Sequence, residues 1–358
     1  MYKPITYIRD NFFKIASIFL TTIIFLFIFL IFGLKIKPST LKETIIGNVT
    51  PRNVYLGFWT GGLWDNESKR INPEKLREIE NKIGKEVAIA NYFRGWEHLS
   101  VEAEINNELK TISENGWVPM ISTNPYFFSK CKTLKHKNLY RSIADGECDV
   151  FLHEVGKNLS KLDSNFFLRF AWEMNVNTMD WSIQKTYSNP NDFIEAWRRI
   201  YRIFQLEGAN KNIIWVYSPQ VETPSTIDIA KLYPGDEYVD WVALDGYNWG
   251  STKTWSKWTS FSGIFYKSYL KMKEIAPNKK FMIAEVNTVS VGGNQALWYK
   301  EMLSKEIPDV FTKIDAIIFF NEDKTKQEGV KWLIDSSEES LNELRNGLKN
   351  PIYKSTFE

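Results

Sequence analysis

The stretch that decides the fold reads Val239-Asp-Trp-Val-Ala-Leu-Asp-Gly-Tyr-Asn248. Its first six residues are mainly apolar, β-branched or aromatic, which is typical of a strand buried on both faces of a parallel sheet. Asp245, Tyr247 and Asn248 follow directly, so the run ends in a carboxylate, a phenol and an amide. A buried strand with polar side chains at its carboxyl end predicts a functional site at that edge of the sheet.

Seven other runs of five to seven residues share this character. They lie at 54–58, 87–93, 117–121, 166–170, 213–217, 281–285 and 314–320. Amphipathic patterns predict helices between them, at 73–83, 101–113, 192–206, 265–275, 295–303 and near 339–348. Eight strand–helix units in about 295 residues predict an α/β fold, a (β/α)8 TIM barrel.

An open, doubly wound sheet is the alternative arrangement of alternating strands and helices. The first strand is not followed by a G-x-G-x-x-G sequence and the chain contains no P-loop, so the nucleotide signals of that fold are missing. We therefore favour the barrel and expect no cofactor. The three histidines, His98, His136 and His153, are too dispersed for a His-rich site, and no metal is expected.

The N-terminal part of the chain contains an uncharged apolar segment at 15–34. Twenty helical residues span roughly 30 Å, the thickness of the hydrocarbon core of a bilayer. A cleaved signal peptide is the alternative, but its apolar region usually has only about 7–15 residues before a small-x-small site. The predicted organisation is a flank at 1–14, a transmembrane signal anchor at 15–34, a linker at 35–52 and a barrel at 53–350. Basic residues flank the segment on both sides, so charge does not orient it.

The composition excludes some classes of partner. The formal charge is +2, but residues 1–41 hold five basic residues and one acidic residue, which leaves 40 basic against 42 acidic residues in the remainder. A near-neutral body predicts no nucleic-acid partner. Aromatic residues make up 15% of the chain, which suits a large core or platforms for sugar rings. Cys131 and Cys148 are either bridged or two half-buried thiols.

Two glutamates follow two of the predicted strands. Glu173 comes shortly after the fourth strand, and with period 2 it shares a face with Arg169 and Ala171. Glu285 ends the seventh strand. Because polar residues at the carboxyl ends of barrel strands face the active-site mouth, we expect both carboxylates there. Salt bridges at the rim of a barrel are the plain alternative.

The neighbours of these glutamates favour a polysaccharide cleft. Asp245, Tyr247 and Trp249 follow the sixth strand, and other large or polar residues are expected on strand-end loops. These are Trp96, Asn124, Trp172 and Trp181. Cleavage of a glycosidic bond with retention needs one carboxylic acid to protonate the leaving oxygen and one carboxylate about 5–5.5 Å away to attack the anomeric carbon. Mutual repulsion and exclusion of water predict Glu173 as the acid/base, and Arg169 and Tyr247 would keep Glu285 ionised as the nucleophile.

Two motifs make the chain resemble glycoside hydrolase family 26 over roughly residues 53–348. The stretch at 233–248 is similar to the family's run from a Tyr-Pro-Gly turn through the sixth strand, and 169–175 is similar to its motif Arg-x-x-His-Glu-Met-Asn. The resemblance implies a (β/α)8 retaining hydrolase with Glu173 as acid/base and Glu285 as nucleophile. It also implies that Asp245 binds substrate and that Tyr247 orients the nucleophile. Most family members resemble β-1,4-mannanases, and lichenases and β-1,3-xylanases also occur.

The chain departs from that motif in two places. Trp172 replaces the His before the acid/base, and Val176 replaces the Gly that commonly follows Asn175. An indole donates one hydrogen bond and accepts none, so the sugar contact made by that His must change. The predicted substrate-binding residues are Arg169, Trp172, Asn175, Asp245, Tyr247, Trp249, Trp96, Asn124 and Trp181.

The sequence thus predicts a membrane-anchored retaining endo-β-glycosidase acting on β-1,4-mannan or a related β-glucan. It would be a single-pass membrane protein with its catalytic domain on the extracytoplasmic side. The alternative is a barrel that only binds glycan, or one that transglycosylates, as an accessory to polysaccharide-synthesis machinery. The presence of both Glu173 and Glu285 favours the enzyme.

Overall fold

The computed structural model describes residues 52–65, 67–126, 131 and 138–357. Eight strands pair side by side and in parallel, and the last of them, β10, returns to pair with β1. They are β1 (Val54–Thr60), β4 (Ile89–Phe93), β5 (Val118–Thr123), β6 (Phe166–Phe170), β7 (Ile213–Tyr217), β8 (Trp241–Asn248), β9 (Lys280–Thr288) and β10 (Ile314–Lys324). This closed ring confirms the (β/α)8 barrel and excludes the open sheet.

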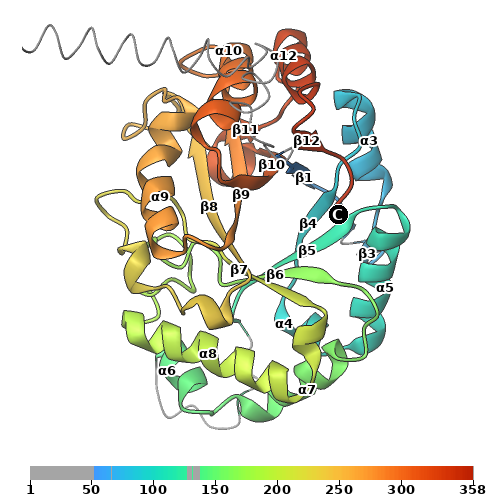
Figure 1. Ribbon diagram of the computed structural model, residues 1–358, viewed down its shortest axis with the longest axis vertical. Coiled ribbons are helices and arrows are strands. Elements are labelled where there is room, and N and C mark those ends of the chain that lie inside the picture. The colour runs from blue at the N-terminus through green and yellow to red at the C-terminus, as the bar shows by residue number, and fades with distance from the viewer. Residues whose placement is uncertain (1–51, 66, 127–130, 132–137, 358) are drawn as a thin grey trace, which may run out of the picture. The chain divides into compact units, whose positions relative to one another are not determined.

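Helices surround the ring of strands (Figure 1). The longer ones are α3 (Glu74–Ile83), α5 (Glu102–Glu114), α7 (Asp149–Leu159), α8 (Pro190–Leu206), α9 (Phe261–Ile275), α10 (Gln295–Glu301) and α12 (Glu338–Leu348). Shorter helices are α4 (Trp96–Leu99), α6 (Leu139–Ala144) and α11 (Thr325–Glu328). Local signals explain several boundaries: α8 begins at Pro190 after a capping box formed by Asn189 and Asp192, and α3 ends at Gly84 in the left-handed conformation.

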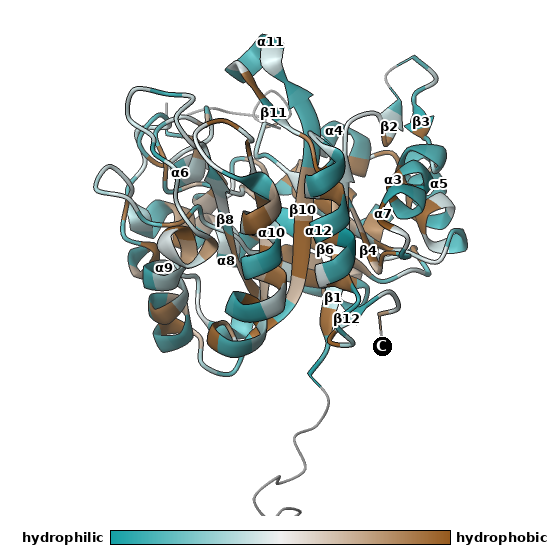
Figure 2. Cartoon of the chain, turned by 90° about the horizontal axis from the view of Figure 1, so that it is seen from above, coloured by the Kyte–Doolittle hydropathy of each residue, from teal (hydrophilic) through white to brown (hydrophobic). Residues whose placement is uncertain are grey.

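Short strands extend the barrel at its edges. The hairpin of β2 (Trp64–Asp65) and β3 (Arg70–Ile71) stands apart, β11 (Val330–Trp332) pairs antiparallel with β10, and β12 (Tyr353–Lys354) pairs with β1. Figure 2 shows α11 and β11 projecting beyond the ring. β11 pairs with Glu322–Lys324, at the carboxyl end of β10.

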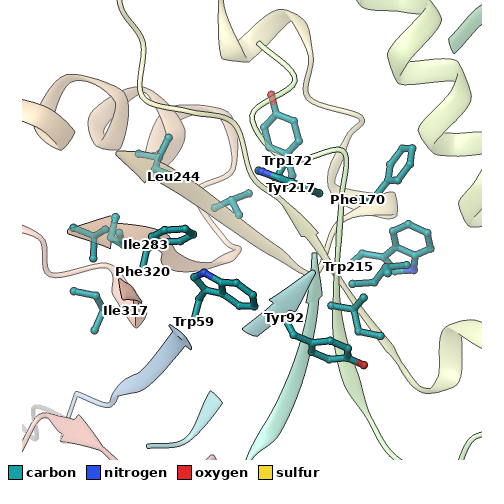
Figure 3. Packing of buried hydrophobic residues seen from close by; sticks show 14 of the residues in the cluster. Trp59, Tyr92, Phe170, Trp172, Trp215, Tyr217, Leu244, Ile283, Ile317 and Phe320 are labelled. Atoms are coloured by element: carbon teal, nitrogen blue, oxygen red, sulfur yellow. The ribbon is translucent and has the colours of Figure 1, made fainter. Parts of the chain in front are cut away.

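Alternate side chains along the strands build two apolar layers. One lies inside the ring and includes Tyr55, Met120, Phe167 and Trp241. The other lies between strands and helices, as Leu56 and Phe58 do on the same strand β1. In Figure 2 the strands are largely brown and the outer faces of the helices largely teal. Figure 3 shows some of these buried rings and aliphatic side chains, among them Phe170, Trp215 and Leu244.

Two sequence expectations need correction or completion. The helix predicted at 295–303 is α-helical only to Glu301 and continues as a π-helix over Met302–Val310, within which Pro308 has no N–H to donate. Cys131 and Cys148 form a disulfide, so the bridged alternative is the one observed.

The predicted segment 15–34 lies outside the described residues. Within the described part of the chain, no helix is long and apolar enough to cross a membrane.

Candidate active site

The segment after β6 places Glu173 by an unusual backbone. The strand ends at Phe170, and both Ala171 (φ 50°) and Glu173 (φ 54°) adopt the left-handed conformation. The expectation that period 2 continues to Glu173 is therefore wrong. Backbone hydrogen bonds of 2.8 Å hold the turn, from Ala171 N to Thr123 O and from Glu173 N to Ser218 O. The backbone of a residue other than glycine is strained at positive φ. Such strain persists only where neighbouring contacts enforce it, commonly at functional sites.

Arg169 is the centre of a buried polar network inside the ring. Its side chain is fully buried, and Nη2 and Nη1 contact Asp245 Oδ2 and Glu285 Oε1, both at 2.5 Å. Nε and Nη1 also donate to the hydroxyls of Ser218 at 2.9 Å and Ser122 at 3.0 Å. Arg169 was predicted to bind substrate; the structure buries its side chain completely among four protein partners, two of which are carboxyl groups.

Two serines that the sequence analysis did not single out complete this network. Ser218 accepts from Arg169 and donates to Asp245 Oδ2 at 3.0 Å, while Ser122 donates to Asn91 Oδ1 at 2.9 Å. Ser122 lies near the carboxyl end of β5, and Ser218 directly follows β7. Serines at strand ends carry no distinctive sequence signal. Only their position next to Arg169 in the folded structure identifies these two as part of the network.

Glu285 receives a hydrogen bond on each carboxylate oxygen. Oε1 accepts from Arg169 and Oε2 accepts from the hydroxyl of Tyr247. Burial raises the pKa of Tyr247 well above its usual value, and the Glu285 charge adds to this, so the phenol keeps its proton and remains a donor. The structure thus brings Arg169 and Tyr247 into contact with Glu285; that they keep it ionised stays a prediction.

Glu173 lies within the field of Glu285, Asp245 and Arg169, and it forms no ion pair among the residues that the structure describes. Burial raises its pKa well above the ordinary value, and the charges of Glu285 and Asp245 raise it further, while Arg169 opposes them. Burial also raises the pKa of Asp245, although Arg169 opposes that shift too. The raised pKa of Glu173 favours its protonated form, whereas Glu285 accepts two hydrogen bonds. Acid-assisted nucleophilic displacement requires two carboxyl groups in such different environments.

Trp172 and Trp181 lie together next to this network. Their ring centroids are 4.3 Å apart, and the Trp181 indole donates to the Trp172 carbonyl at 2.7 Å. Trp172 also lies 5.7 Å from the Arg169 guanidinium. The structure therefore brings these two predicted residues to the carboxylates.

The predicted residues Asn175 and Asn124 have structural partners. The buried amide of Asn175 donates to Gln220 O and accepts from Gln220 N, both at 2.9 Å, so it ties the turn after β6 to the segment after β7. Asn124 is half-buried and accepts from the backbone N of Tyr126 at 3.0 Å.

The two remaining predicted tryptophans, Trp96 and Trp249, lie in different places. Trp96 was expected on an exposed loop, but it begins α4 and is fully buried against Phe170 and Phe204, so it belongs to the core. Bulky apolar side chains on short loops are buried whenever a helix covers them. Trp249 remains partly exposed and packs against Trp332, whose ring also contacts Tyr247 at 4.7 Å. Trp332 was missed because it lies on β11, beyond the predicted eighth strand.

No group of three or more His, Cys, Asp or Glu side chains is arranged to hold a metal ion among the residues that the structure describes.

Most of the barrel sequence matches the model of a known protein family. The profile of glycosyl hydrolase family 26 matches residues 54–301. Endoglucanase H of Acetivibrio thermocellus is 27% identical over 319 residues, covering 88% of this chain and 32% of that protein. Mannan endo-1,4-beta-mannosidase A and B of Caldalkalibacillus mannanilyticus is 28% identical over 239 residues, covering 56% of this chain and 45% of that protein. The chain thus spans a third to a half of the length of these relatives.

Solved structures share the fold. The Bacillus subtilis mannanase man26 superposes with a TM-score of 0.56 at 20% identity, covering 86% of this chain and 88% of that chain. The catalytic domain of an endo-beta-1,4-mannanase from Bacillus sp. JAMB-750 gives a TM-score of 0.61 at 16% identity, covering 85% and 87% of the two chains. At these identities the likeness concerns the fold.

Proposed function

The chain belongs to glycosyl hydrolase family 26, and on that premise we propose that it is a retaining endo-β-glycosidase with Glu173 as acid/base and Glu285 as nucleophile. The observation that carries the proposal is the unequal environment of the two carboxyl groups. Arg169 and Tyr247 both donate to Glu285, whereas no hydrogen bond to the Glu173 carboxyl occurs among the described residues. One group is thus suited to attack as an anion and the other to deliver a proton.

The reaction proceeds by double displacement. Glu173 gives its proton to the leaving glycosidic oxygen as Glu285 attacks the anomeric carbon, which forms a covalent glycosyl-enzyme and releases the shortened glycan. Glu173, now a carboxylate, then removes a proton from water, which attacks the same carbon and displaces Glu285. Arg169 and Tyr247 orient Glu285 for attack through the hydrogen bonds that they donate to its two oxygens. Asp245 holds Arg169 in place from the opposite side.

The proposed substrate is a β-linked polysaccharide, most directly β-1,4-mannan or a related β-glucan. The relatives named above are mannan endo-1,4-β-mannosidases and an endoglucanase, which supports this range of backbones. Trp172, where the family motif has His, places an indole directly before the acid/base and favours a sugar contact by stacking over one by hydrogen bonding.

We also propose that the barrel is anchored outside the cytoplasm through residues 15–34. The support is the length of the uncharged apolar segment and the location of polysaccharides outside the cell. Fractionation of cells is expected to recover the protein in the membrane, with its N-terminus intact. Recovery from the medium of mature protein that begins after residue 34 would refute the anchor.

The function is tested with the full-length protein in detergent, incubated with mannan, mixed-linkage glucan and xylan. The wild type is expected to shorten at least one polymer, and proton NMR is expected to show that the new reducing end first appears as the β-anomer. Glu285→Ala is expected to lose at least about 10³-fold in kcat/KM.

The matched control is Glu274→Gln, which removes an exposed carboxylate of α9 and should leave the rate unchanged. Binding of a polymer by wild type without cleavage would replace the enzyme by a glycan-binding barrel. Longer rather than shorter products would indicate transglycosylation. Release of the α-anomer would contradict the double displacement.

A further inference from the structure

Aromatic rings form a continuous series along the carboxyl ends of the barrel strands. Each ring lies between 4.3 and 6.1 Å from the next, centroid to centroid. We call this series the aromatic belt; in order it consists of Tyr126, Trp181, Trp172, Phe93, Trp59, Phe320, Tyr247, Trp332, Trp249 and Trp255. Figure 3 shows Trp59 next to Phe320 in the middle of the belt, with Trp172 to one side. The belt passes the nucleophile, because Tyr247 donates to Glu285.

Both ends of the belt reach solvent. Trp255 is 70% exposed and Tyr126 is 46% exposed, whereas Trp172 and Trp59 in between are nearly buried. The two ends come from different strands, since Trp255 follows β8 and Tyr126 follows β5, with β7 and β6 between them in the ring. The rings therefore continue beyond the place where one sugar unit meets Glu173 and Glu285.

The loop that carries Trp255 is held in place by its backbone. Gly250 is in the left-handed conformation, and a Cβ there would lie 1.9 Å from Val291 O, so only glycine permits this approach. Ser251 N donates to Val291 O at 3.2 Å, and Ser256 Oγ donates to Gly250 O at 2.8 Å. The Lys253 ammonium donates to Glu328 O and lies 5.7 Å from the Trp249 ring.

The loop is fixed, yet it leaves the Trp255 indole exposed to water. Packing within the protein therefore does not explain the position of this ring. An exposed ring on an ordered loop loses little entropy when a ligand covers it, which makes it an efficient platform. A pyranose ring presents a flat face of C–H groups that fits an indole, and burying this face removes apolar area from water. The contact of Trp255 with Trp249 makes this platform continuous with the candidate active site.

We propose that Trp255 is an outer sugar-binding platform, which holds a unit of the β-linked substrate chain beyond those bound next to Glu173 and Glu285. The inference rests on the proposed function and deepens it, because it identifies the substrate as an extended chain rather than a short oligosaccharide. An extended chain held at Trp255 favours cleavage within a polymer over removal of terminal units.

The test compares kcat/KM for the tri- and hexasaccharide of the polymer that the wild type cleaves, using the full-length protein in detergent. For Trp255→Ala, the ratio of the hexasaccharide value to the trisaccharide value is expected to fall roughly tenfold, mainly through KM. Trp255→Phe retains a flat ring and should recover most of the ratio. Leu206→Ala, at an equally exposed apolar residue at the end of α8 that precedes β7, should leave the ratio unchanged.

A ratio in Trp255→Ala equal to that of wild type would overturn the proposal while leaving the hydrolase intact. If the wild type cleaves no polymer, affinity electrophoresis in gels with mannan or mixed-linkage glucan decides instead. Retardation of the wild type that is lost in Trp255→Ala would support the platform without the hydrolase. Equal retardation, or none for either protein, would overturn it. Unchanged thermal unfolding of Trp255→Ala verifies that the fold is retained.

Discussion

At the scale of single residues, the site is governed by a shortage of positive charge. Arg169 makes ion pairs with Asp245 and Glu285, and Glu173 is the third carboxyl group in the same buried region. Burying three anions around one cation is unfavourable, because desolvation exceeds what a single ion partner restores. The raised pKa of Glu173 favours a proton there, which relieves this excess of negative charge. In the proposed mechanism, catalysis and the stability of the fold therefore depend on the same proton.

Glu173→Gln is expected to change the pH dependence of activity. The pKa of Glu173 is raised above the ordinary value of about 4.3. The alkaline limb of the wild-type kcat/KM profile should therefore lie at this raised pKa. Gln does not titrate, so this alkaline limb should disappear and the rate should drop by about 10²–10⁴-fold. The pH profile of kcat/KM checks it, and an alkaline limb at the same pH in the variant would exclude Glu173 as the acid.

The same substitution should stabilise the fold at high pH. A carboxyl group whose pKa is higher in the folded than in the unfolded chain contributes its full stability below the unfolded pKa, and that contribution is lost as the pH rises through the folded pKa. Gln removes this loss, so the gain in Tm over the wild type should be larger at about pH 8 than at about pH 4. An equal Tm difference at both values would contradict the shift.

At the scale of elements, strand β1 illustrates how tightly the ring is packed. A Cβ at Gly57 would lie 2.4 Å from Ile318 Cδ1 and 2.9 Å from Ile89 O, so the strands on both sides approach the backbone of this residue. Glycine is needed here for space, in contrast to Gly250, where the backbone angle also requires it. The close approach of β4 and β10 thus requires a glycine at position 57 of β1.

Gly57→Ala should therefore destabilise the barrel by about 1–3 kcal/mol through overpacking. Ile318→Val removes the nearest atom and by itself should cost about 0.5–1.5 kcal/mol. In the double variant the two costs should not add, because the shortened side chain makes room for the new methyl group. Urea unfolding of the four proteins measures the coupling, and strict additivity would show that Ile89 O alone sets the cost.

At the scale of the whole molecule, the disulfide between Cys131 and Cys148 closes a loop across a separation of 17 residues. The loop joins the segment after β5 to the start of α7. A bridge of this span limits the conformations of the unfolded chain and should stabilise the fold by about 3 kcal/mol. It also agrees with the proposed location outside the cytoplasm, where such bridges persist.

Cys131→Ser/Cys148→Ser should lower the Tm by about 5 °C or more while leaving kcat/KM near the wild-type value. Differential scanning calorimetry with and without reductant checks it. Addition of reductant should lower the Tm of the wild type and leave that of the double variant unchanged. A double variant as stable as the wild type would show that the bridge does not restrict the unfolded chain.

Local pattern predicts most of the fold and part of the site. All eight barrel strands were predicted within a few residues, because strands buried on both faces have no polar alternation to obscure them. The turn at Ala171 and Glu173 was not predicted, because hydrogen bonds to Thr123 and Ser218 impose its left-handed backbone conformation. Trp96 was wrongly placed on the surface for a related reason: burial depends on which helix covers a loop.

The sequence by itself determined that eight buried strands alternate with helices and that glutamates lie near the carboxyl ends of the fourth and seventh strands. These features reside in runs of neighbouring residues, where hydrophobicity and spacing act locally. Only the tertiary structure decided that Arg169 also pairs with Asp245, that Ser122 and Ser218 contact it, and that the aromatic belt runs from Tyr126 to Trp255. The physical reason is that Arg169 and Asp245 are 76 positions apart and meet only because the parallel strands close into a ring.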